Sequence, residues 1–152
     1  MHSISALEIL LEENYMNIKE QAKRNFTEKK YNCCQAVVCA YCQEMNMDDT
    51  EIFRLAEGFG GGMAIKDVCG AATGMFMGIG LHNSAGDKSE PHATKMQTYE
   101  DVRNAAAEFE KKCDSLYCRD IKNLVDGQQK ISCARCVEVA AEYLEKYVDE
   151  HK

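Results

Sequence analysis

The sequence predicts an all-α fold, a single-domain bundle of about six to seven helices around a central helix rich in glycine, alanine and methionine. Three observations support this prediction. Apolar residues recur with the 3.6-residue period of an amphipathic helix, and no run shows a convincing strand-like alternation. Pro91 is the only proline, so few positions would break a helix. The chain has 152 residues, a length that suits one domain.

The predicted helices follow one another along the chain with short connections. The expected ranges are 4–24, 33–45, 49–58, 67–81, 93–112, a short helix after Asp114, and 132–148. The glycine-rich residues 58–62 are expected to form an interhelical turn, since they match neither a P-loop nor a dinucleotide-binding motif. Residues 82–92 are polar and contain the proline, so they are expected to form a flexible connection within the single domain 1–152.

The fourth predicted helix is apolar on all sides, which is typical of a central, buried helix. Its glycines Gly70, Gly74 and Gly78 recur every four residues and therefore share one face. Small residues on one face allow another backbone, or an inorganic group, to come close. Tight helix packing is the favoured interpretation of this stripe.

Charge and hydropathy indicate which partners and which location to expect for the protein. The net charge of −7 argues against nucleic acid or an anionic membrane as the main partner, because both require clustered Lys and Arg. The uncharged stretch 68–81 is too short to span a bilayer, and the first residues lack the basic region of a signal peptide. The sequence therefore predicts a soluble, cytoplasmic protein without membrane insertion.

Nine cysteines are unusual for a chain of this length. Their odd number, the expected absence of an export signal and a chain long enough to fold without bridges all argue against a disulfide scaffold. Cysteine enrichment in a reducing compartment indicates metal, cluster or thiol redox chemistry instead. So many thiols also suggest an anaerobe as the source.

Four cysteines lie at the predicted starts of four helices: Cys33, Cys69, Cys118 and Cys133. Each follows residues that favour the N-cap position: Asn32, Asp67, Asp114 or Ser115, and Ser132. Helix N-termini present unpaired N–H groups and a partial positive charge, which stabilise the thiolate form. If these helix starts converge, the four sulfurs form a site for a metal ion or a cluster.

The other five cysteines have weaker signals. Cys34, Cys39, Cys42 and Cys113 are expected to be small buried side chains. Cys136 forms a C-x-x-C pair with Cys133 at a helix start, which is a workable dithiol. Gln43 and Val137, rather than histidine, follow the two C-x-x-C motifs, so no c-type haem is expected.

Five parts of the sequence form a pattern in a fixed order: residues 31–38 (YNCCQAVV), 60–63 (GGGM), 68–74 (VCGAATG), Cys118, and Cys133 with Val137, Ala140 and Ala141. This pattern resembles the C_GCAxxG_C_C family of proteins described as redox-active. The resemblance assigns the four family cysteines to Cys33, Cys69, Cys118 and Cys133, with Cys34 and Cys136 as second-choice ligands. The family is similar to the helical part of split-Soret cytochrome c, which implies an all-α fold and a two-iron cluster.

Two classes of function remain open at this stage. The first is binding of a cysteine-ligated iron–sulfur cluster, with electron transfer to an unknown redox partner. The second is a thiol–disulfide oxidoreductase or redox sensor that uses Cys133 and Cys136 or pairs of the core cysteines. A structural zinc site is a further alternative. No acid–base pair marks an enzyme; if the chain is one, it is an oxidoreductase. The helices rich in small residues and tyrosine also offer a surface for a homodimer.

Overall fold

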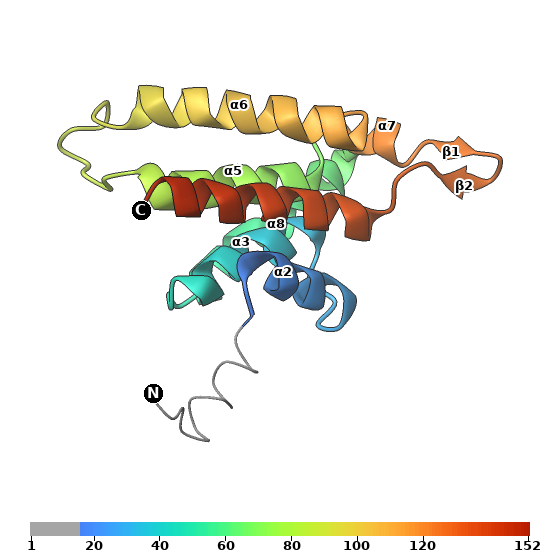
Figure 1. Ribbon diagram of the computed structural model, residues 1–152, viewed down its shortest axis with the longest axis horizontal. Helices are drawn as coiled ribbons and strands as arrows, with labels where there is room; N and C mark the ends of the chain where they lie inside the picture. The colour runs from blue at the N-terminus through green and yellow to red at the C-terminus, as the bar shows by residue number, and fades with distance from the viewer. Residues whose placement is uncertain (1–15) are drawn as a thin grey trace, which may run out of the picture.

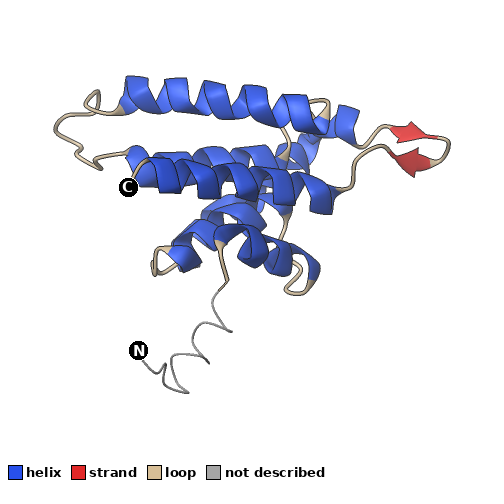
Figure 2. Cartoon of the chain, viewed as in Figure 1, coloured by secondary structure: helices blue, strands red, loops and turns tan. Residues whose placement is uncertain are grey.

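A computed structural model describes residues 16–152 and confirms the all-α fold (Figures 1 and 2). The longer helices are α2 (Ile18–Thr27), α3 (Cys33–Glu44), α4 (Thr50–Ala56), α5 (Gly70–Asn83), α6 (Lys95–Cys113) and α8 (Cys133–Glu150). The shorter elements are η1 (Glu57–Phe59), η2 (Gly62–Lys66), α7 (Cys118–Ile121), β1 (Leu124–Val125) and β2 (Gln128–Gln129). No helix in this part of the chain is long and apolar enough to cross a membrane.

Helix α5 has the central position that its composition predicts. It contacts α3, α6 and α8, with α6 and α3 on opposite sides of it (Figure 1). A Cβ atom at Gly74 would lie 2.7 Å from the carbonyl oxygen of Cys34, and one at Gly78 would lie 2.5 Å from Leu144 Cδ2. The glycine stripe therefore lets α3 and α8 pack closely on α5. The sequence did not predict that α3 is equally central: residues 34–42 are all buried.

Helices α3, α5 and α8 point the same way. Their N-terminal cysteines line one cavity, whereas Tyr41, His82 and Tyr147 meet near their C-terminal ends. Helix α6 runs in the opposite direction, since Asp101 in its first half bonds Tyr147 and its last residue, Cys113, contacts Cys136. The bundle thus places three helix N-termini at one end.

Three sequence predictions of helix boundaries are wrong. The helix expected over 4–24 begins only at Ile18 in the described residues, because Asn17 has an extended backbone and its side chain accepts from the Glu20 amide as the N-cap; residues 4–15 lie outside the described part. The helix expected from residue 67 begins at Gly70, because Val68 forms a β-bridge with Tyr117. The cap of α7 is Tyr117, neither Asp114 nor Ser115, since Asp114 has a left-handed backbone (φ 70°) that ends α6.

The polypeptide between these helices is also more ordered than the sequence indicates. Residues 57–59 and 62–66 form two short turns, and within the second Met63, Ala64 and Lys66 adopt left-handed backbones. Strands β1 and β2 pair in an antiparallel hairpin around Asp126 and Gly127, both with positive φ. This Asp-Gly turn is a strong hairpin signal, so the expectation of no strands is wrong here.

Candidate functional site

The structure brings the four predicted cysteines together. Cys33, Cys69, Cys118 and Cys133 line one small cavity of about 20 Å³. The remaining lining residues are Gly61, Gly62, Gly70, Ile121, Lys122 and Cys136. Cys69 and Cys118 are about 6 % and 5 % exposed, so bulk water has little access to their sulfurs. Residues that are up to 100 positions apart in the sequence thus share one protected space.

Cys33 is placed by the cap of α3. Asn32 accepts from the Gln35 amide, and the Gln35 side chain accepts from the Asn32 amide, which completes a capping box. The Asn32 side chain also donates to the Glu57 carbonyl oxygen at 3.1 Å. A Cβ atom at Gly60 would lie 2.7 Å from the Asn32 side chain, so the glycine-rich turn packs directly on this cap.

Cys69 and Cys118 are fixed as a pair by backbone hydrogen bonds. The Cys69 amide donates to the Leu116 carbonyl oxygen, and the Cys118 amide donates to the Asp67 carbonyl oxygen, each at 2.7 Å. These bonds flank the Val68–Tyr117 bridge. The two cysteines are therefore held at the starts of α5 and α7 by a contact between segments about 50 residues apart.

Cys133 is the first residue of α8, after the Ser132 cap that accepts from the Arg135 amide. The Cys33 thiol donates to its sulfur, and Gln129 of β2 donates to it at 3.6 Å. These bonds, with nearby Lys122, outweigh burial and lower the pKa of Cys133 to about 5. The same bond and burial raise the pKa of Cys33, so the pair shares one proton.

Cys136 joins the cavity to a sixth cysteine. Its thiol contacts both Cys69 and Cys113, and these contacts, with burial, raise the pKa of Cys136. The hydrogen bond from Cys136 lowers the pKa of Cys69 against the effect of burial, and the amides of Ala71 and Ala72 act in the same direction. Cys136 therefore stays protonated between two sulfurs that favour the thiolate.

The field around the cavity favours anionic sulfur. The first turns of α3, α5 and α8 point their unpaired amides and the positive ends of their dipoles toward it. The ammonium group of Lys122 acts on Cys33, Cys118 and Cys133 in the same sense. Burial opposes these effects. At Cys118 burial has the largest influence, so the pKa of the Cys118 thiol is raised. The site thus compensates, from several sides, for the cost of burying thiolates.

The cysteines around the cavity are chemically suited to bind a metal ion or a metal cluster through thiolate ligands. Four cysteines with a fifth beside them match the ligands of iron–sulfur clusters and of cysteine-bound zinc. The thiols now contact one another, and residues 16–152 contain no group of three Cys, His, Asp or Glu side chains already spaced around a metal ion. Loading a metal would therefore release the protons that these thiols share.

The remaining cysteines lie elsewhere. Cys34, a second-choice ligand by sequence, is fully buried and does not line the cavity; its sulfur contacts Met77 Sδ at 3.6 Å. Burial raises the pKa of Cys34 and Cys42 to about 11 and that of Cys39 to about 12. All three are neutral at physiological pH and belong to the core, as expected for small buried side chains.

Lys122 and Gln129 are site residues that the sequence analysis missed. Both lie around the β1–β2 hairpin, and only the folded chain shows that this hairpin turns Gln129 onto Cys133. Lys122 follows Cys118 by one helical turn, a spacing that could have drawn attention to it once Cys118 was chosen.

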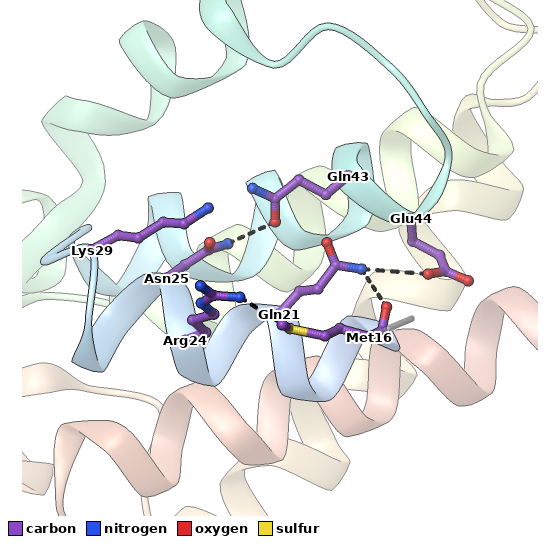
Figure 3. A pocket seen from close by; sticks show the side chains of 7 residues that line it. All are labelled: Met16, Gln21, Arg24, Asn25, Lys29, Gln43 and Glu44. Atoms are coloured by element: carbon purple, nitrogen blue, oxygen red, sulfur yellow. Dashed lines mark hydrogen bonds between the residues drawn. The ribbon is translucent and has the colours of Figure 1, made fainter. Parts of the chain in front are cut away.

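A larger cavity, of about 390 Å³, lies between α2 and α3 (Figure 3). It is lined by polar side chains that bond one another, such as Asn25 to Gln43 at 3.1 Å and Gln21 to Glu44 at 3.5 Å. It has no cysteine or histidine in its lining. The sulfur-lined cavity is therefore the stronger candidate site despite its smaller size.

Comparison with known proteins agrees with the sequence motifs. A family model described as "Putative redox-active protein (C_GCAxxG_C_C)" matches residues 31–147, which include all nine cysteines. No curated protein and no solved structure was found to match the chain. The match covers well over half of the chain, from the residue before the α3 cap to the last turns of α8. The chain therefore belongs to the C_GCAxxG_C_C family.

Proposed function

We propose that the chain binds a two-iron iron–sulfur cluster through Cys33, Cys69, Cys118 and Cys133 and transfers electrons. The observation that carries this proposal is the convergence of these four side chains, from four separate elements, on one buried cavity. The bound cluster would supply one-electron transfer. Family membership supports redox activity in general.

The chain's own residues suit this role. The backbone around Cys69 and Cys118 is fixed by hydrogen bonds on both sides of the Val68–Tyr117 bridge, so two ligands are positioned before any metal arrives. The helix N-termini and Lys122 stabilise negative charge at the cavity, which favours thiolate ligands and a reduced, more anionic group. Nine free thiols also favour a reducing, cytoplasmic setting.

Metal and sulfide analysis of protein prepared without oxygen tests the proposal. We expect iron and acid-labile sulfide in equal amounts and the visible absorption of a cluster. Cys69→Ala should abolish both, whereas Cys39→Ala, which removes a buried thiol outside the cavity, should retain them. Stoichiometric zinc in place of iron would support the structural zinc alternative. Protein without iron after reconstitution with iron and sulfide would contradict the proposal.

Thiol–disulfide chemistry is the second candidate, and one contact favours it. Cys33 and Cys133 share a proton, and the pKa of Cys133 falls to about 5, as in an attacking thiol with its resolving partner. The structure thus favours Cys33, rather than Cys136, as the partner of Cys133. This function predicts an iron-free protein with a reversible two-thiol titration that Cys133→Ser abolishes.

A further inference from the structure

Cys113 and Cys136 form a second pair of thiols, outside the set of four. Cys113 is the last residue of α6, and Cys136 lies in the first turn of α8. Their thiols lie close enough to act on each other's pKa, and each residue is about 1 % exposed. Antiparallel α6 and α8 bring these two positions together, although 22 residues separate them in the sequence.

The pair spans the wall between two cavities. Cys136 lines the sulfur-lined cavity, whereas Cys113 lines a separate pocket of about 190 Å³. The lining of the second pocket includes the polar residues Asp114, Ser115, Asp120 and Lys130. Lys130 and Asp114 form an ion pair. A small polar molecule in this pocket would therefore have Cys113 as the nearest thiol.

The two thiols also differ in what they face. Cys113 lines the second pocket, whereas Cys136 lines the sulfur-lined cavity. A molecule in the second pocket can therefore reach Cys113 first, and Cys136 is the neighbouring thiol that can resolve a mixed disulfide. Nearby Cys136, Arg135 and Lys112 lower the pKa of Cys113 against the effect of burial, which agrees with an attacking role.

We propose that Cys113 and Cys136 form a reversible dithiol–disulfide centre that exchanges with low-molecular-weight disulfides entering the pocket beside Cys113. The Cys113 thiolate attacks one sulfur of the small disulfide, the S–S bond breaks, and one small thiolate leaves and takes a proton from water. Cys136 then attacks the Cys113 sulfur of the mixed disulfide, and its proton passes to the second small thiolate as that leaves. One small disulfide is thus reduced to two thiols, and one protein disulfide forms.

This centre would also be linked to the sulfur-lined cavity. Formation of the Cys113–Cys136 disulfide removes the only proton with which Cys136 can bond Cys69. The oxidised pair would therefore leave Cys69 without this donor. The exchange itself does not depend on the group that the four cavity cysteines hold, so it can succeed or fail independently of the iron–sulfur proposal.

Disulfide mapping after equilibration with a small redox couple tests the proposal. Full-length protein, isolated without oxygen, is equilibrated at fixed ratios of 2-hydroxyethyl disulfide to 2-mercaptoethanol, quenched in acid, alkylated and digested with trypsin. Cleavage after Lys112, Arg119, Arg135 and Lys146 separates Cys133 from Cys136 and leaves Cys113 and Cys118 in one peptide. We expect a bridge between peptides 113–119 and 136–146, rising with the ratio and reversed by excess 2-mercaptoethanol.

Variants assign this bridge to a residue. Cys113→Ser should abolish it, whereas Cys39→Ala should leave its dependence on the ratio unchanged. A bridge that persists in Cys113→Ser would involve Cys118 and would overturn the proposal. So would a bridge from Cys136 to Cys69 or Cys133, or full alkylation of Cys113 and Cys136 at every ratio. If Cys113→Ser does not fold, tandem mass spectrometry of the wild-type peptides locates the bridged cysteine directly. Iron measured in the same samples tests the cluster proposal separately.

Discussion

The two ends of the parallel helices α3, α5 and α8 carry different chemistry. At their N-terminal ends lie Cys33, Cys69 and Cys133, around a cavity. At their C-terminal ends Tyr41 bonds His82 Nδ1 at 3.0 Å, and His82 Nε2 donates to the His151 carbonyl oxygen at 3.0 Å. Helix polarity accounts for the difference, because free amides at N-termini favour anions and free carbonyls at C-termini favour N–H donors.

The ends also differ in what holds them together. The C-terminal end of these helices, around Tyr41, His82 and Tyr147, is called the far end here, and the cavity end the sulfur end. The far end is fixed by side chains, such as the buried hydrogen bond from Tyr147 to Asp101 at 2.8 Å. The sulfur end depends on the backbone, through the Val68–Tyr117 bridge and the left-handed residues between Gly61 and Lys66. Unfavourable backbone conformations persist where surrounding contacts enforce them, and they often cluster at functional sites. Removal of a hydrogen-bonding side-chain group should therefore destabilise the protein mainly at the far end. Addition of a side chain at a glycine with a constrained backbone should disturb mainly the sulfur end.

The largest effect should come from Gly62→Ala. Gly62 has φ +65°, and a Cβ atom there would lie 2.6 Å from the Asp67 amide nitrogen and 2.8 Å from Cys118 Cβ. We expect a loss of about 2–4 kcal/mol in the free energy of unfolding, together with loss of metal binding, because both the φ value and the space exclude a side chain.

Gly80→Ala is the matched control for Gly62→Ala. Gly80 lies within α5, and nothing occurs within 4 Å of a Cβ atom placed there. This substitution should stabilise the protein by up to about 1 kcal/mol through helix propensity. Urea denaturation measures both variants. Equal stability of Gly62→Ala and the wild type would refute the idea that the backbone constrains the sulfur end.

Tyr147→Phe should destabilise the far end alone. The substitution removes one of the donors to Asp101, a side chain that is about 8 % exposed and that also accepts from Gln97. The loss should be about 1–3 kcal/mol, since a buried charged acceptor loses one of its partners. Tyr99→Phe on the half-exposed face of α6 should change stability by less than about 0.5 kcal/mol. Altered metal content in Tyr147→Phe would show that the two ends are coupled.

Gln129→Ala tests a side-chain contribution at the sulfur end. In reduced, metal-free protein the pKa of Cys133 is about 5, so its thiolate should persist as the pH falls from 7 to about 6. Loss of the Gln129 donor should raise that pKa by about half to one unit, the equivalent of one weak hydrogen bond. The pH dependence of Cys133 alkylation by iodoacetamide, located by mass spectrometry, measures the change. Gln128→Ala, on the neighbouring residue, should leave the profile where it is.

At the sulfur end, the starts of α3 and α8 could be predicted from the sequence, because Asn32 and Ser132 make their cap hydrogen bonds to residues three positions away. The convergence of the cysteines was a hypothesis from four such starts and a family resemblance. Its geometry depends on Val68 meeting Tyr117, a long-range contact that neither local segment encodes.

Two further features had no usable local signal. The left-handed backbones of Met63 and Ala64 occur in residues that rarely adopt them, so only tertiary contacts can account for them. The sequence predicted that Cys136 lies near a helix start, but it did not predict the neighbours of this thiol. Its contacts with Cys69 and Cys113 come from the packing of α5 and α6 on α8. Local rules thus give the helix ends, and tertiary packing decides which ends meet.

The smallest expected effect concerns Glu145, on α8 between the two ends. Its Oε1 atom is buried without a hydrogen-bond partner in residues 16–152, and burial raises the pKa of its carboxyl group despite bonds from the Lys19 and Ile18 amides. A raised folded-state pKa means that the contribution of this group to stability is greatest in acid and declines as the pH rises through that pKa.

Glu145→Gln should therefore have the same free energy of unfolding as the wild type near pH 3 and a larger one at pH 7. The gain should be below about 0.5 kcal/mol, because solvent screens a partly exposed group. Urea denaturation at both pH values measures it, and a variant less stable than the wild type at pH 7 would show that the charged carboxylate stabilises the start of α2.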